Sequence, residues 1–201
     1  MKGTRFIPLI AGACLIALLP ARALAGRYAI APGEPNLVRF DSKAPAESFS
    51  GKTRKISGRI EVNPARLADS VFVEVEVNMA TLDTGIELRN RHMRDDHLET
   101  ATYPRAVFRS TRLLGPSQPA LSEGGKTTFT LEGTLTLHGV AQTVQVPVEA
   151  ELVAKDGKTG VHAVVHFQVK LSDYKVPRPQ FLFLRLDEVQ RITVDVTGVA
   201  S

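Results

Sequence analysis

The sequence predicts an all-β protein, a closed antiparallel barrel of about eight strands with one inserted helical segment. Most segments alternate apolar and polar residues with period two, which is the signature of half-buried strands. These runs are rich in β-branched residues, and turn-forming pairs separate them. Strands and helices do not alternate and no internal repeat occurs, so one domain is expected.

The stretch from 71 to 78, VFVEVEVN, has the clearest alternation. Its four valines share one face, whereas Phe72, Glu74 and Glu76 share the other. The pairs His138-Gly139 and Asp156-Gly157 each separate two β-rich runs and predict hairpins. The remaining predicted strands cover 37–42, 55–62, 105–112, 127–137, 142–153, 160–171 and 191–199.

Two long neighbouring runs, 127–137 and 142–153, favour a closed barrel over a small sandwich. Closure also removes the exposed strand edges that make such chains associate. A barrel of about eight strands is either filled by side chains or holds one small ligand. The chain has nine phenylalanines and no tryptophan, so the interior should be apolar. Composition alone does not separate a filled core from a ligand cavity.

One segment, 83–99, departs from the strand pattern. It reads DTGIELRNRHMRDDHLE, with few β-branched residues and many good helix formers. Ile86, Met93 and Leu98 can line one irregular apolar face of such a helix. Pro104 follows and prevents continuation of the helix.

The first 25 residues have the pattern of a secretory signal peptide. Lys2 and Arg5 precede the apolar run 6–19, and Ala23 and Ala25 suit a cleavage site after Ala25. The apolar run is shorter than the roughly 20 residues of a membrane-spanning helix. We therefore expect a signal peptide at 1–25, a barrel domain at 26–201 without a membrane span, and a periplasmic or secreted location.

Charge and cysteine content exclude several functions for the mature chain. Cleavage removes three basic residues and leaves 22 basic against 21 acidic ones, so the charge gives no support for nucleic-acid binding. The single cysteine, Cys14, lies in the predicted signal peptide. The mature chain would then have no disulfide and no thiolate metal ligand.

The histidines are the remaining candidates for chemistry. His162 and His166 share a strand face but lie roughly 13 Å apart, too far to chelate one ion. His92, Asp96 and His97 lie in the helical segment and could act as acid–base or metal-binding groups. Because no further ligand is placed by sequence, a solvated helix face is favoured, and no catalytic residue, metal or cofactor is predicted.

Large apolar side chains on the strands and in one late segment are candidate lumen residues. The run FLFL at 181–184 breaks the alternation and fits either a buried strand or a flap over an apolar cavity. The candidate lumen residues are Phe72, Phe108, Phe129, Leu135, Phe167, Phe181 and Phe183.

Several short motifs, in order and spacing, resemble the YceI-like polyisoprenoid-binding family over nearly all of 26–201. They are FDSKA at 40–44, FSG at 49–51 and SGRI at 57–60, followed by LDTG, RNRHMRDDHLE and TATYPRAVFRS between 82 and 110. The stretch LEGTLTLHGVAQTVQV at 131–146 resembles the family's hairpin. The resemblance implies a lipocalin-like, extended eight-stranded antiparallel barrel that holds a long isoprenoid or fatty chain, and it brings no catalytic residues.

One region departs from the family pattern. The family's Arg-Ser-Asp-aromatic-Gly stretch is here Leu171-Ser172-Asp173-Tyr174-Lys175, without the arginine and the glycine. We expect the segment 171–184 to alter the mouth of the lumen and the choice of ligand.

The leading hypothesis is an exported binding protein for a long-chain isoprenoid or related amphiphile. The head group is expected to meet Arg89, His92 or Arg94 if the helical segment caps the mouth. The alternatives are an enzyme acting on a small amphiphile through His92, Asp96 and His97, and a non-catalytic interaction module with a filled core. The sequence leaves a homodimer open.

Overall fold

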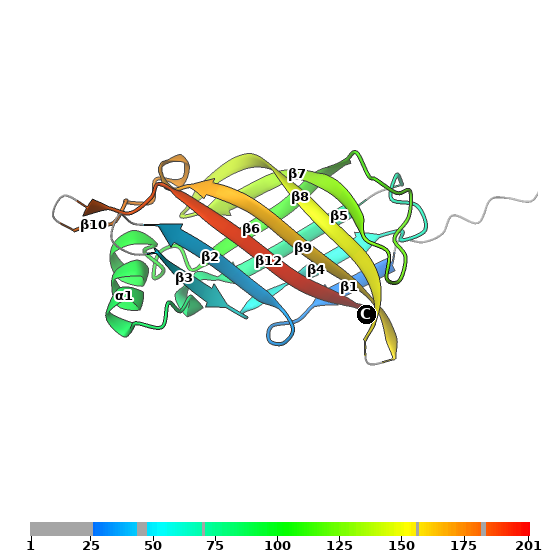
Figure 1. The fold of residues 1–201 in the computed structure, drawn as a ribbon, viewed down its shortest axis with the longest axis horizontal. Coiled ribbons are helices and arrows are strands. Elements are labelled where there is room, and N and C mark those ends of the chain that lie inside the picture. The colour runs from blue at the N-terminus through cyan, green and yellow to red at the C-terminus, as the bar shows by residue number, and fades with distance from the viewer. Residues whose placement is uncertain (1–25, 44–47, 70, 156, 182–183) are drawn as a thin grey trace, which may run out of the picture.

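The computed structural model describes residues 26–43, 48–69, 71–155, 157–181 and 184–201, and it confirms the all-β barrel (Figure 1). The predicted signal peptide and Cys14 lie outside the described residues. The strands are β1 (Gly26–Ile30), β2 (Leu37–Lys43), β3 (Ser48–Thr53), β4 (Ile56–Val62), β5 (Val71–Asn78), β6 (Arg105–Leu114), β7 (Thr127–Leu137), β8 (Val140–Lys155), β9 (Lys158–Lys170), β10 (Gln180–Phe181), β11 (Leu184–Arg185) and β12 (Val189–Ala200).

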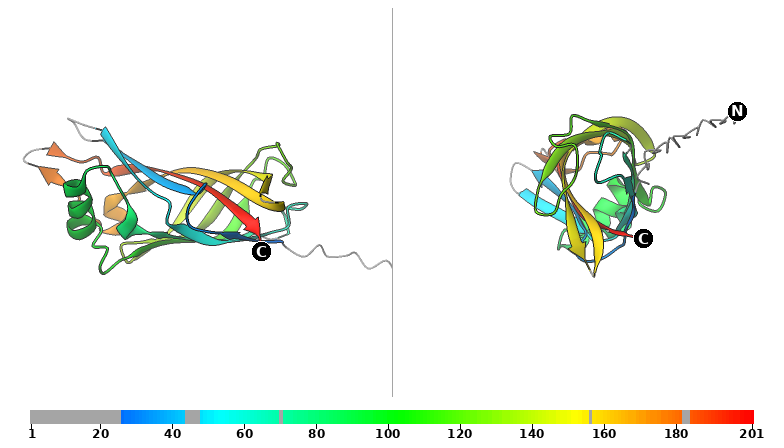
Figure 2. Two further views of the ribbon diagram at one scale, coloured as in Figure 1. Left: turned by 90° about the horizontal axis from the view of Figure 1, so that it is seen from below. Right: turned by 90° about the vertical axis from the view of Figure 1, so that its right-hand side faces the viewer.

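One main antiparallel sheet forms the barrel. Its order is β1-β4-β5-β6-β7-β8-β9-β12-β2-β3, and pairing of β1 with β12 closes it. Because β1 pairs with β4 and β2 pairs with β3, the first four strands make one long hairpin that is interrupted in the middle. The barrel therefore has the eight strand positions that the sequence predicts, and it is closed when viewed along its axis (Figure 2, right).

The helical segment lies where the sequence predicts it. It consists of helix α1 (Glu87–His92) and the π-helical turn η2 (Met93–His97), preceded by the 3-10 turn η1 (Met79–Thr81). A third short helical turn, η3 (Leu171–Tyr174), follows β9. The helix α1 and the small hairpin β10–β11 both lie at one end of the elongated barrel (Figure 1).

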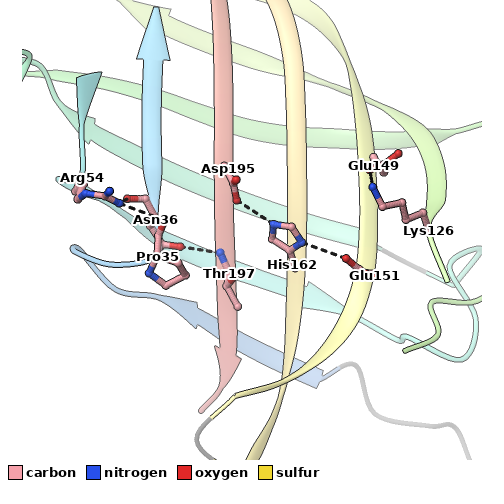
Figure 3. Close-up of polar contacts among 9 residues, drawn as sticks. All are labelled: Pro35, Asn36, Arg54, Lys126, Glu149, Glu151, His162, Asp195 and Thr197. Carbon is pink, nitrogen blue, oxygen red and sulfur yellow. Dashed lines mark hydrogen bonds and ion pairs between the residues drawn. The ribbon is translucent and has the colours of Figure 1, made fainter. Parts of the chain in front are cut away.

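The buried side chain of Asn36 joins the interrupted first hairpin to β12. The last residue of β12 that pairs with β2 is Asp195, and pairing with β1 begins at Val199. In between, Asn36 Oδ1 accepts a hydrogen bond of 2.7 Å from the backbone N–H of Thr197 (Figure 3). Asn36 Nδ2 donates another of 2.7 Å to the carbonyl of Ala31. The side chain thus replaces the missing strand partner at the point of closure.

Polar side chains cross-link the strands on the outside of the barrel. His162 on β9 lies between two carboxylates, with Nε2 2.9 Å from Asp195 Oδ1 on β12 and Nδ1 3.4 Å from Glu151 Oε1 on β8 (Figure 3). The contact of His166 is separate, with Nδ1 3.0 Å from Thr193 Oγ1. The two histidines therefore have separate partners.

Strand prediction missed two short strands of the barrel sheet. The segment Gly26–Ile30 has only five residues, and Ser48–Thr53 is polar with a central glycine, so neither has a clear alternating pattern. β1 occupies the same strand position of the barrel as β2, and β3 occupies the same position as β4. The turn at His138-Gly139 is confirmed, with φ of 50° and 72°.

Replacing Asn36 by alanine is expected to destabilise the barrel by about 2–3 kcal/mol. The substitution leaves the buried Thr197 N–H without its partner and removes the partly buried hydrogen bond to the Ala31 carbonyl. Urea unfolding measures the change. The matched control is His166→Ala, which removes an exposed hydrogen bond and should cost about 0.5 kcal/mol or less. Equal effects of the two substitutions would contradict the role of Asn36.

Candidate ligand-binding lumen

An apolar lumen of about 810 Å³ runs inside the barrel. This volume lies in the range of small-molecule binding sites. The inward-facing residues of the strands line it, as in β5, where Val71, Val73, Val75 and Val77 all contribute. The lumen excludes the alternative of a solid, side-chain-filled core.

The far end of the lumen is covered by two loops that hydrogen bond to each other. The backbone N–H of Leu67 donates to the carbonyl of Pro119 at 2.9 Å, and that of Leu121 donates to the carbonyl of Pro64 at 2.7 Å. Both leucine side chains line the lumen and are almost completely buried. This end is therefore closed by apolar side chains on a hydrogen-bonded frame.

The opposite end, which carries α1, forms the mouth. Ile86 and Leu88 line the lumen there and are 50% and 56% exposed. Because the lining residues at the far end are buried and these are exposed, the lumen opens beside α1. Met93 and Leu98 line the same end, which agrees with the apolar helix face predicted for Ile86, Met93 and Leu98.

The polar side chains of the described lining all come from two segments. Arg89, His92 and His97 belong to the helical segment, and Gln190 begins the inward face of β12. All the other lining residues of the described chain have aliphatic, aromatic or methionine side chains. A ligand with one polar end and a long apolar body matches this distribution.

Arg89 is held at the mouth by a partly buried hydrogen-bond network. Its Nε donates to Thr84 Oγ1 and its Nη2 to the Thr84 carbonyl, both at 3.0 Å, and the guanidinium lies 4.2 Å from the centre of the Phe49 ring. Thr84 Oγ1 donates in turn to Asn90 Oδ1 at 2.7 Å. Asn90 is buried, and its Nδ2 donates to Asp83 Oδ1 at 2.7 Å. The network fixes the position of a positive charge beside the lumen.

Asp83 attaches the helical segment to the barrel. Its backbone exchanges two hydrogen bonds of 2.9 Å with Lys52 on β3. The hydrogen bond from the backbone N–H of Gly85 and then that from Asn90 lower the pKa of the Asp83 carboxyl. The carboxylate is therefore ionised at neutral pH and keeps the start of the segment in place.

His97 is a partly buried imidazole at the mouth. Burial lowers its pKa, and the hydrogen bond to the Pro177 carbonyl and the charge of Asp96 oppose this effect only in part. Its Nδ1 atom is buried and has no hydrogen-bond partner. The ring is therefore neutral at pH 7 and adds little charge to the mouth.

Most of the residues predicted to line the lumen do so. Phe108, Phe129, Leu135 and Phe167 are part of the lining. The backbone of Phe181 lies in β10, whereas its side chain and the whole of Phe183 lie outside the described residues.

The prediction for Phe72 is wrong. The lining of β5 consists of its valines, and Phe72 lies on the opposite, outer face, where the Arg59 guanidinium lies 5.0 Å from its ring centre. The same outer face carries Glu74, whose Oε2 accepts a hydrogen bond of 2.7 Å from Arg109. The larger side chain is thus outside and the four smaller valines are inside.

Of the three predicted head-group residues, the structure places two at the mouth. Arg89 and His92 line it, but Arg94 does not. Arg94 Nη2 instead forms an ion pair of 2.9 Å with Glu87 Oε1 at the start of α1. Arg94 is thus part of the helix surface.

The three residues of the catalytic alternative differ in their exposure. His92 and Asp96 are exposed, whereas His97 is half-buried against Pro177. In the parts of the chain that the structure describes, no three His, Cys, Asp or Glu side chains are grouped closely enough to hold a metal ion. No helix among these residues is long and apolar enough to cross a membrane.

Sequence reasoning missed the small residues of the lining. Ala150 on β8 and Ala163 on β9 pair with each other and face the lumen. The period-two alternation of β8 and β9 places both alanines on the inward face, but a prediction based on side-chain size favours the phenylalanines. Gln190 was also missed, although it starts the inward series that continues with Ile192 and Val194.

The fold and the site place the protein in the class of closed β-barrels whose apolar lumen is open at one end. The family model described as the YceI-like domain matches residues 28–198. The chain therefore belongs to the YceI-like family.

Similar proteins agree with this assignment. A UPF0312 protein from Vibrio parahaemolyticus is 28% identical over 171 residues, which cover 83% of this chain and 86% of the relative. Protein YceI from Escherichia coli O157:H7 is 36% identical over 121 residues, 58% of this chain and 56% of that protein.

Solved structures share the fold. A polyisoprenoid binding domain from Saccharophagus degradans aligns with a TM-score of 0.65 at 16% identity, covering 88% of this chain and 99% of that one. BcnA from Burkholderia cenocepacia aligns with a TM-score of 0.63 at 20% identity, covering 81% and 95%. At these identities the likeness concerns the barrel fold.

The lowered pKa of His97 predicts a pH-dependent stability. Folding favours the neutral ring, so its contribution is present above the ordinary pKa of 6.5, begins to fall below that value, and is lost as the pH falls through the lower pKa of the folded state. Replacing His97 by glutamine should flatten the fall in unfolding free energy between about pH 7 and 5. Urea unfolding across this range measures it. An unchanged pH profile in the variant would refute the prediction.

Proposed function

We propose that the barrel binds a long-chain isoprenoid or a related amphiphile in its lumen, with the apolar chain inside and the polar end at the mouth. The observation that carries the proposal is the distribution of polar groups, which are confined to the open end of an otherwise apolar lumen. The similarity to a polyisoprenoid binding domain supports the same class of ligand.

The size of the lumen suits such a chain. At ~30 Å³ for each water-sized group, about 810 Å³ holds on the order of 25 groups. Each buried methylene contributes about 0.8 kcal/mol, so about ten of them supply roughly 8 kcal/mol before the cost of ordering the ligand. Tight binding then needs few polar contacts.

The proposed head-group contacts are Arg89 and His92. The network through Thr84 and Asn90 holds the Arg89 guanidinium in one place, so an anionic or hydroxylated ligand end could bind it without a large loss of side-chain entropy. His92 is exposed on the same helix and lines the same opening.

We also propose that the protein acts outside the cytoplasm as a binding protein without a chemical step. The signal-peptide pattern of 1–25 supports export to the periplasm or beyond. A role in carrying, storing or sensing lipid requires only uptake and release through the mouth, with no catalytic group.

Lipid analysis of protein purified from its own host tests this function. Native mass spectrometry and lipid extraction should identify an apolar guest with a long chain. If the purified protein is empty and also takes up neither polyprenyl alcohols nor fatty acids from solution, the proposal is wrong.

Filling the deep half of the lumen should shorten the chain that the protein accepts. Ala163→Phe places a ring in the lumen, so uptake of long polyprenyl alcohols should fall at least about tenfold, equivalent to about 1.4 kcal/mol, whereas short ones should still bind. Competition with a fluorescent fatty acid measures both.

The matched control is Val164→Phe, the neighbouring position, whose side chain lies against a shallow groove on the outer face of the barrel. This variant should bind chains of all lengths as the wild type does. Equal behaviour of the two variants would contradict binding in the lumen.

A further inference from the structure

One buried polar side chain interrupts the apolar strand lining of the lumen. Gln190 is 6% exposed and is the first inward residue of β12 that lines the lumen. The other polar side chains of the described lining are those of Arg89, His92 and His97, which belong to the helical segment and are more exposed. Because β12 starts at the end of the barrel that carries α1 (Figure 1), Gln190 lies inside the mouth.

One half of the Gln190 amide is used by the protein itself. Its Nε2 donates a hydrogen bond of 2.6 Å to the carbonyl of Asp187, just before β12 begins. A carbonyl oxygen can only accept a hydrogen bond, so the amide atom that faces it has to be the nitrogen. The orientation of the amide is thereby fixed, and Oε1 is the atom left for another partner.

This amide oxygen has no donor in the protein. Among the residues that the structure describes, none donates a hydrogen bond to Gln190 Oε1. On the neighbouring strand β2, Asp41 lies opposite Arg191, so the next residues, Ser42 and Gln190, both point to the inward face. Ser42 is 1% exposed, and its Oγ has no hydrogen-bond partner either. Gln190 Oε1 is therefore a buried acceptor without a donor.

A buried acceptor of this kind favours a ligand that brings a hydrogen atom. An acceptor that has lost its water and found no donor is costly, and a hydrogen bond from a bound ligand removes that cost. A hydroxyl group has the hydrogen that is needed. An ionised carboxylate has only acceptor atoms, and its negative charge would face the lone pairs of Oε1.

The helical segment is compatible with the same group. The proposed head-group residue Arg89 is a donor, fixed by its hydrogen bonds to Thr84. A hydroxyl oxygen accepts hydrogen bonds while its hydrogen is donated, so one hydroxyl suits both kinds of polar group at the mouth. A carboxylate suits only the donors of the helical segment.

We infer that Gln190 is a ligand-binding residue whose Oε1 accepts a hydrogen bond from a hydroxyl group, so that the lumen takes a long-chain alcohol in preference to the corresponding carboxylate. This inference rests on the proposed function, because it assigns the chemistry of the polar end of the chain held in the lumen. The apolar body of the ligand then lies along the inward residues that follow on β12, Ile192, Val194 and Val196.

Competition between three ligands with one isoprenoid chain tests the inference. They are geranylgeraniol, its methyl ether and geranylgeranoic acid, and each displaces the uncharged fluorescent probe N-phenyl-1-naphthylamine at neutral pH. The alcohol should bind the wild type at least about tenfold more tightly than the ether or the acid, equivalent to about 1.4 kcal/mol. An alcohol loses more hydration than an ether when it enters an apolar site, so this preference requires an acceptor in the protein.

Replacing Gln190 by methionine keeps the length of the side chain and removes the acceptor. The affinity ratio of alcohol to ether should fall to about one. Loss of the hydrogen bond to Asp187 acts on all three ligands alike, so the ratio reports the contact with the hydroxyl. The matched control is Gln168→Met on the exposed outer face of β9, which should keep the wild-type ratio. Thermal unfolding followed by circular dichroism checks that both variants are folded.

The outcomes separate this inference from the proposed function. If the ether or the acid binds the wild type as tightly as the alcohol does, the hydroxyl site is refuted while binding in the lumen stands. A folded Gln190→Met variant that keeps the preference for the alcohol also refutes it. If the wild type binds neither the probe nor any of the three ligands, the proposed function is wrong and the inference falls with it.

Discussion

Closure of the antiparallel ladder is the constraint on which the rest of the structure depends. One edge of β12 pairs first with β2 and then, nearer the C-terminus, with β1. The side chain of Asn36 supplies the hydrogen bonds where the partner strand changes. Once the ladder is closed, alternation with period two sends every second residue inward. Apolar residues therefore gather inside, and ion pairs such as that of Arg109 with Glu74 lie outside.

The lumen stays open because of the size of the inward residues and the shape of the barrel. Valines line all inward positions of β5, and the small side chains of the pair Ala150–Ala163 take up little space between β8 and β9. Protein interiors are normally packed to the density of organic crystals, so side chains that face each other across the lumen make fewer dispersion contacts with one another than those of a filled core. A flexible apolar chain can restore these contacts without a specific shape, so such a site needs few polar groups.

The sequence predicts the framework well and the site only in part. Period-two alternation identifies the long strands, because register and face follow from it directly. It fails for Phe72, since β5 is apolar on one face and mixed on the other, and the prediction followed side-chain size rather than the consistent face. For the head group, Arg89 and Arg94 are five residues apart, about 140° around a helix, so both cannot face the lumen. The sequence predicts this angle but not which face of the helix lies toward the barrel. The ion pair with Glu87 places Arg94 outside the lumen.

The inserted helical segment makes the two ends of the lumen different. A symmetrical barrel with two apolar loop covers would enclose a chain without orienting it. Here one end is sealed by Leu67 and Leu121, and the other carries the network that fixes Arg89 and the neutral His97. An amphiphile that enters with its polar end first would leave that end unsolvated against leucines, at a cost of several kcal/mol. Entry with the apolar end first would leave the polar end of the proposed ligand beside Arg89, so the different construction of the two ends would favour this orientation.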